Sequence, residues 1–114
     1  SLRRQRQMCI RDRAKVAAGN AAIAASIPSG WALFDLAGLY NDVVTTGVSE
    51  DGFNMTGDFV FGGFFSLDGF NPTSRGSALI AKRMLAAIDA TYGSNLSEAG
   101  LDIGDYPTNY PDGI

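Results

Sequence analysis

Apolar residues recur at helical spacing in three stretches of the chain. Residues 14–26 are dense in alanine, a strong helix former, and a Pro-Ser-Gly turn at 28–30 ends this predicted helix. Residues 37–44 predict a second, shorter helix. Residues 72–92 predict the best helix in the chain, because one stripe collects six of its less polar side chains. These are Leu79, Ile80, Met84, Ala87, Ile88 and Thr91.

The last of these helices has start and stop signals. Asn71 or Thr73 can accept a hydrogen bond from the first free backbone N–H groups, and Pro72 suits the first turn. Gly93 supplies the left-handed residue that commonly ends a helix. After Gly93 the chain is polar and without periodicity, which predicts a loop or tail.

The remaining segments predict short strands and irregular structure. Residues 31–36 form a short apolar run, typical of a strand buried on both faces. A helix, a turn and a buried strand in succession favour an α/β fold with a parallel sheet. Residues 47–67 predict an irregular excursion with short strands. Its phenylalanines are expected to pin it to the domain, with substrate lining as the alternative.

One tetrapeptide, Asp-Gly-Phe-Asn, occurs at 51–54 and again at 68–71. Asp-Gly favours turns because glycine accepts a positive φ. Two copies are too few and too short for a solenoid, so we interpret them as two similar turns.

The first thirteen residues differ from the rest and resemble the conceptual translation of a sequencing adapter. We interpret 1–13 as non-native and exclude it from fold reasoning. A basic arm that binds nucleic acid or membrane is one alternative, and a signal-peptide start is another, although no adequate apolar core follows. The longest apolar run, 21–27, is too short to span a bilayer. No transmembrane segment is therefore expected.

Excluding 1–13 changes the charge balance. Five of the nine basic residues and one of the twelve acidic residues lie there, which leaves four and eleven, a net of −7. Nucleic acid is not expected as a partner, because binding phosphate requires clustered cations. Cys9, the sole cysteine, lies in the same segment, and the chain has no histidine. The rest of the chain therefore offers no thiolate nucleophile and no Cys/His metal site.

Residues 68–76 carry the chemistry of the chain. A carboxylate three residues before a histidine, in a loop entering a helix, can orient the imidazole that takes a proton from a serine hydroxyl. The block resembles the Asp-x-x-His-Pro signature of SGNH/GDSL-type serine hydrolases. Residues 64–69 resemble that family's approach to the site, and 75–93 resemble the helix that follows. By this resemblance Asp68 holds the orienting acid position and Asn71 the position of the general-base histidine.

The resemblance to bacterial GDSL-like lipase/acylhydrolases covers most of residues 14–105. It implies the C-terminal part of a three-layer α/β/α, flavodoxin-like sandwich with a parallel sheet, followed by a loop or tail at 106–114. It also implies hydrolysis of a small-molecule or lipid ester by the full-length protein, without cofactor or metal. The location stays open among secreted, periplasmic and lipid-anchored.

The family's Gly-Asp-Ser nucleophile block is not in the sequence, and we interpret Ser66, Ser74 and Ser77 as turn and helix-start residues. Asn71 has three interpretations: a structural asparagine, a true His-to-Asn change in a repurposed hydrolase, or a read error. With Asn71 in place the fragment is expected to be inactive, because an amide has no basic nitrogen near neutral pH.

The alternative function is a non-catalytic acidic binding module for Ca²⁺ or carbohydrate. It would use oxygen ligands, which suit calcium. The candidate ligands are Asp51, Asn54, Asp58 and Asp68.

Overall fold

A computed structural model describes residues 2–109 of the chain. The chain divides into two compact units, residues 1–33 and residues 34–114, and each is described by itself.

The first unit is a single long helix, α1 (Leu2–Ser26), followed by an irregular segment. The predicted helix at 14–26 is confirmed, and α1 continues through position 13 without a break. The side chains of residues 3–26 are all exposed, so α1 has no buried face. Within residues 2–109, no helix combines the length and hydropathy needed to cross a bilayer.

The predicted strand at 31–36 is wrong. Residues 31–35 have no regular structure, Leu36 begins a helix, and the Trp31 side chain is 64% exposed. A strand needs a neighbouring strand to receive its backbone hydrogen bonds. The described chain offers none to this segment, because its strands pair only with each other.

The predicted fold class is wrong for the same reason. The structure is mostly helical (55%) and its sheet is a two-stranded antiparallel hairpin, so it is not part of a parallel-sheet α/β/α sandwich.

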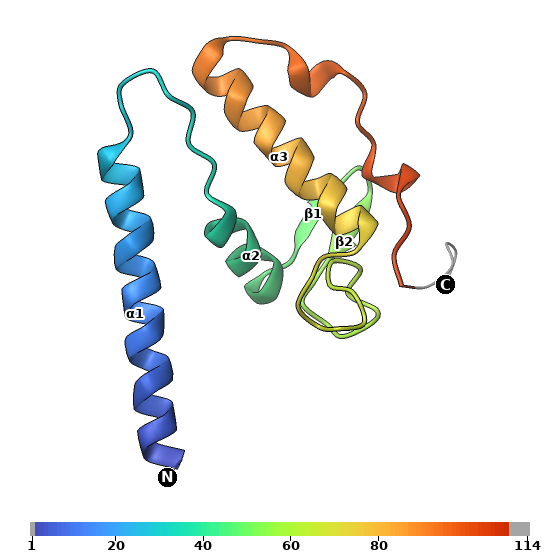
Figure 1. Cartoon of the computed structure of the whole chain (residues 1–114). Coiled ribbons are helices and arrows are strands. Elements are labelled where there is room, and N and C mark those ends of the chain that lie inside the picture. Colours follow the sequence, from blue (N-terminus) through green and yellow to red (C-terminus); the bar gives the residue numbers. More distant parts are fainter. Residues whose placement is uncertain (1, 110–114) are drawn as a thin grey trace. The chain divides into compact units, whose positions relative to one another are not determined.

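The second unit places two helices around this small hairpin (Figure 1). The predicted helices at 37–44 and 72–92 are both confirmed to within two residues. The irregular excursion with short strands is also confirmed. The elements are α2 (Leu36–Thr45), β1 (Val48–Glu50), β2 (Phe53–Met55), α3 (Ser74–Tyr92) and the 3₁₀ turns η1 (Leu96–Glu98) and η2 (Ile103–Asp105).

The core of this unit lies between α2, β2 and the first half of α3. Phe64 is at its centre, and its ring meets the rings of Tyr40 and Phe65 edge-to-face, with centroids 5.1 and 4.9 Å away. Such pairs add to the stabilisation from burial alone. The other buried apolar side chains are Leu39, Val43, Met55, Ala78, Leu79 and Ile103.

Residues 94–109 form a strap that packs against α3 through its two 3₁₀ turns (Figure 1). The sequence predicts only a loop or tail here, yet Ile103 is fully buried. The strap therefore completes the core. Of the predicted tail at 106–114, residues 110–114 lie outside the described part of the chain.

Candidate functional site

The loop of residues 65–72 holds both predicted site residues and leads directly into α3. An antiparallel bridge between Phe65 and Pro72 closes it, and the Ser66 N–H donates to the Asn71 carbonyl at 2.7 Å. Thr73 then caps the helix, because its hydroxyl accepts from the Gly76 N–H at 3.0 Å. The cap is Thr73, one of the two predicted candidates, which leaves the Asn71 side chain available to the loop.

Asp68 is the hub of this loop. Its Oδ1 accepts from the Phe70 N–H at 2.7 Å, the Ser66 hydroxyl at 2.8 Å and the Asn71 N–H at 2.8 Å. Its Oδ2 accepts from the Asn71 side-chain amide at 2.7 Å. These hydrogen bonds hold the pKa of Asp68 well below its ordinary value of 3.8, and the bond from the Phe70 N–H contributes most to this lowering. The carboxylate is therefore ionised at neutral pH.

The structure thus brings the two predicted site residues into direct contact. Nδ2 of an asparagine is bonded to Cγ, as is Nδ1 of a histidine, so both nitrogens lie at the same covalent distance from the backbone. The Asn71 amide donates to Asp68 in the way that an imidazole Nδ1–H would. What Asn71 lacks is a second nitrogen that could accept a proton from a nucleophile. The pair can orient a group but cannot take a proton from one.

The three serines of this region have the structural roles expected of them. Ser66 donates to Asp68 within the loop, Ser74 is the first residue of α3, and the Ser77 N–H bonds to the carbonyl of the helix cap. No imidazole is available to any of them, because the chain has no histidine.

Close packing of α3 against the segment before the loop fixes the position of the loop. A Cβ on Gly76 would lie 2.6 Å from the carbonyl oxygen of Phe64, so only glycine allows this approach. The Arg75 side chain is buried beside it and donates through Nε to the carbonyls of Ile103 (3.2 Å) and Tyr106 (3.0 Å). Its guanidinium carbon also lies 4.1 Å from the centroid of the Phe53 ring.

Two of these supporting residues were missed by the sequence analysis. The sequence pattern gives Arg75 no role beyond a place in the helix, although its side chain ties the strap to α3. Asn109 was placed in the tail, and its amide donates to the carbonyls of Phe65 (2.7 Å) and Val60 (3.4 Å). No local pattern marks either residue, because their partners lie about 28 to 49 positions away in sequence.

The two Asp-Gly-Phe-Asn copies are both turns, as expected, but they differ in kind. Asp51 and Gly52 have φ of 51° and 84° and form the two-residue loop of the β1–β2 hairpin. Here the carboxylate points away from its own turn and binds Lys82 Nζ at 2.6 Å. In the second copy the Asp68 carboxylate turns inward, onto the backbone and side chain of its own loop.

The alternative ligands for Ca²⁺ or carbohydrate do not gather in one place. Asp51 binds Lys82, Asn54 accepts from Ser49 at 3.1 Å, and Asp58 accepts from the Thr56 hydroxyl at 3.1 Å. Asp68 is taken up by its own loop. Across residues 2–109, no group of three or more acidic, histidine or cysteine side chains is placed to hold a metal ion.

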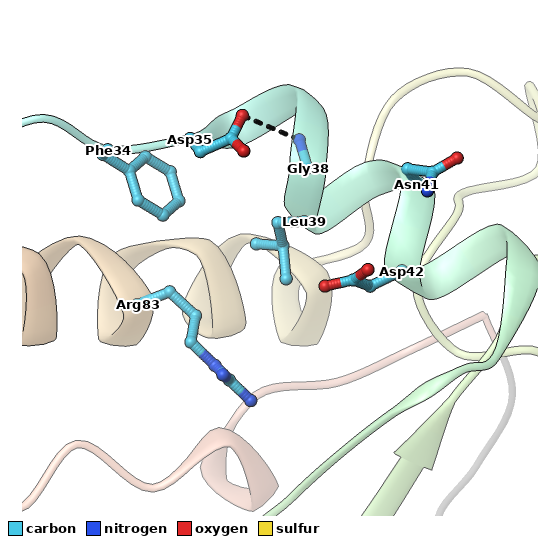
Figure 2. A pocket seen from close by; sticks show the side chains of 7 residues that line it. All are labelled: Phe34, Asp35, Gly38, Leu39, Asn41, Asp42 and Arg83. Carbon is cyan, nitrogen blue, oxygen red and sulfur yellow. Dashed lines mark hydrogen bonds between the residues drawn. The ribbon is translucent and has the colours of Figure 1, made fainter. Parts of the chain in front are cut away.

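A pocket of about 400 Å³ lies between the start of α2 and Arg83 of α3, and Figure 2 shows its lining. Two of its polar side chains have structural roles. Asp35 caps α2 by accepting from the Gly38 N–H at 2.9 Å, and Arg83 pairs with Glu50 at 3.1 Å. No residue of the 65–72 loop lines the pocket, so the pocket and the Asp68–Asn71 pair are separate features.

Comparison with known proteins adds no relative to this description: no family model, no curated protein and no solved structure matches the chain.

Proposed function

We propose that this chain is part of a GDSL-type serine ester hydrolase in which Asp68 is the orienting acid and Asn71 occupies the position of the catalytic base. The observation that carries the proposal is the 2.7 Å hydrogen bond from the Asn71 amide to Asp68. It reproduces the contact that an orienting carboxylate makes with an imidazole Nδ1–H.

The surroundings of the pair suit this role. The loop is closed by a backbone bridge and joined to a capped helix, so Asp68 and Asn71 have little freedom to separate. Both side chains are exposed, as a pair that meets a nucleophile from another part of the protein must be. The chain as it stands is proposed to be inactive, because loss of the triad base costs on the order of 10⁴–10⁶ in rate.

The proposal is tested on the gene. The reading frame upstream of Ala14 is expected to encode a Gly-Asp-Ser block, and a frame without one contradicts the assignment. The extended protein is then assayed on a chromogenic short-chain ester, with its own Asn71 and with Asn71→His. Turnover is expected to rise by several orders of magnitude in the variant.

The second Asp-Gly-Phe-Asn copy provides a matched control. Asn54→His places an imidazole in the same tetrapeptide, where the carboxylate of Asp51 is held by Lys82. This variant is expected to give no gain. Equal gains from both substitutions would show that the imidazole acts in solution rather than in an oriented pair.

A further inference from the structure

The six-residue pattern Ser-x-Asp-Gly-Phe-Asn occurs at 49–54 and at 66–71, and its serine behaves differently in the two copies. In the first copy the Ser49 hydroxyl donates to the Asn54 side chain at 3.1 Å. In the second copy the Ser66 hydroxyl donates to Asp68 Oδ1 at 2.8 Å. Of the two serines, Ser66 alone bonds to the carboxylate of its own copy.

The two oxygens of Asp68 have different partners. Oδ1 accepts from the Ser66 hydroxyl and from the backbone N–H groups of Phe70 and Asn71, at 2.8, 2.7 and 2.8 Å. Oδ2 accepts from the Asn71 side-chain amide. The loop thus holds Oδ1, and Oδ2 faces the side chain at position 71, where the proposed function has the catalytic base.

The Ser66 hydroxyl can be removed without opening the loop. The Ser66 N–H donates to the Asn71 carbonyl at 2.7 Å, and the Ser66 carbonyl accepts from the Gly69 N–H at 2.9 Å. Both bonds belong to the backbone and persist when the side chain becomes alanine. The two backbone donors on Oδ1 persist as well, so Ser66→Ala deletes one of three bonds to that oxygen and leaves the loop closed.

The chain next to the loop is fixed to the core. The Thr73 N–H donates to the Phe64 carbonyl at 2.8 Å, and the Phe64 side chain is fully buried. The expectation that phenylalanines pin this region to the domain therefore holds for Phe64, and it is wrong for Phe59 and Phe61, which are 64% and 68% exposed. With the Phe64 anchor in place, the loop keeps its shape in a variant that lacks the hydroxyl.

The donors on Asp68 are all neutral groups. Within residues 2–109 Asp68 takes part in no ion pair, and the basic side chains of α3 are engaged elsewhere. Arg75 donates to carbonyls of the strap, and Lys82 and Arg83 pair with Glu50 at 3.2 and 3.1 Å. The charge of the Asp68 carboxylate is therefore compensated by hydrogen bonds alone.

Donors that share one carboxylate compete for its charge. A hydrogen bond to a carboxylate favours its charged form, and the Ser66 hydroxyl is the second cause, after the Phe70 N–H, of the lowered pKa of Asp68. A carboxylate stabilised in this way attracts a cation at Oδ2 less strongly. A histidine at position 71 would then hold its proton less tightly, and a general base works best when its pKa lies near the working pH.

We propose that Ser66 is a positioning residue that acts through Asp68: its hydroxyl takes up part of the charge of the carboxylate and so limits how firmly a base at position 71 holds its proton. The consequence for catalysis rests on the proposed function, whereas the effect on proton binding is measurable in the chain as it exists.

The test is an NMR titration of the full chain carrying Asn71→His, whose imidazole is the single one in the protein. Adding Ser66→Ala is expected to raise the imidazole pKa by about half a unit, a modest shift because the pair is exposed. Ser66→Thr keeps the hydroxyl and is expected to leave the pKa where Asn71→His alone puts it. Ser49→Ala is the matched control, since this serine bonds to Asn54, and it should also leave the imidazole pKa unchanged.

Three results would overturn the proposal. The first is an imidazole pKa that Ser66→Ala leaves unchanged or lowers. The second is an equal shift in Ser66→Thr and Ser66→Ala, which would assign the effect to packing and not to the hydroxyl. The third is loss of the parent backbone amide signals of Gly69 and Asn71 in Ser66→Ala, which would show that the hydroxyl closes the loop.

A kinetic measurement separates the role of Ser66 from the proposed function. In the full-length protein with Asn71→His, Ser66→Ala should move the acid limb of the pH–rate profile to higher pH by the same amount as the imidazole pKa. A shifted imidazole pKa without ester turnover would contradict the proposed function alone. Turnover with an unshifted pKa would contradict the role of Ser66 alone.

Discussion

Replacement of Asn71 by histidine tests the central geometry of this structure in the chain as it exists. The chain has no histidine, so the introduced imidazole gives a single set of histidine signals in an NMR titration. Its Nδ1 would take the place of the Asn71 amide nitrogen, 2.7 Å from Asp68 Oδ2. The pKa of Asp68 lies below 3.8, so the carboxylate is charged throughout the titration of an imidazole.

A charged carboxylate at hydrogen-bond distance favours the protonated imidazole. Because the pair is exposed, solvent screening limits the effect, and we expect the imidazole pKa to rise by about one unit above its ordinary value of about 6.5. A group with a raised folded-state pKa stabilises the fold below its unfolded pKa and loses that contribution as pH rises through the folded value. The Asn71→His variant should therefore melt at a higher temperature at about pH 5 than at about pH 8, relative to Asn54→His.

Two controls decide the outcome. Asn54→His should titrate near the ordinary value, and Asp68→Asn combined with Asn71→His should return the imidazole pKa to about 6.5. An imidazole pKa at or below the ordinary value, or one that Asp68→Asn leaves unchanged, refutes the orientation of the pair.

Three further predictions concern the support of the site. Gly76→Ala should destabilise the chain by about 1–2 kcal/mol in urea unfolding, because the clash of the new Cβ with the backbone outweighs a helix-propensity gain of about 1 kcal/mol. Gly19→Ala is the control: nothing lies within 4 Å of its added Cβ, so this variant should instead raise helical content. Arg75→Met should cost about 2–4 kcal/mol and make the strap susceptible to proteolysis, since it leaves the buried carbonyl of Ile103 and the partly buried carbonyl of Tyr106 without their donor; an unchanged urea midpoint would contradict this. Asp89, on α3, accepts hydrogen bonds from Ser94, Leu96 and Ser97 of the strap. These bonds, Ser94 foremost, lower the pKa of Asp89, as the bonds of its own loop lower that of Asp68. Stability should therefore be complete above about pH 3.8 and fall as pH drops through the lowered values, and Asp89→Asn should flatten this decline in a melting series.

Local signals in the sequence predicted the helices of the second unit well. The start of α3 follows from a threonine cap and its end from Gly93, which has φ of 68°, as a left-handed stop requires. The turn at each Asp-Gly pair was likewise predicted from the two residues that form it. These features depend on residues a few positions apart, which is the range over which sequence patterns are informative.

Features set by distant partners could not be predicted in this way. The run at 31–36 has the composition of a buried strand, but a strand exists only where another strand pairs with it. Ile103 lies in a polar stretch and becomes core only because the strap returns to α3. Asp68 and Asn71 were paired by a resemblance, and the structure has a hydrogen bond between their side chains. The support of their loop by Arg75 and Asn109 could not be predicted, because it depends on hydrogen bonds to carbonyl groups far away in sequence.

The Asn71 amide keeps one property of a histidine at this position, the hydrogen bond to Asp68, and lacks the other, the capacity to accept a proton. Histidine and asparagine at this position would both donate to Asp68 and keep the loop closed, so an exchange between them leaves the geometry of the loop unchanged. Selection for a closed loop does not distinguish the two residues, whereas selection for proton transfer does. Under the proposed function, an exchange of histidine for asparagine would therefore remove proton transfer while the loop stays closed.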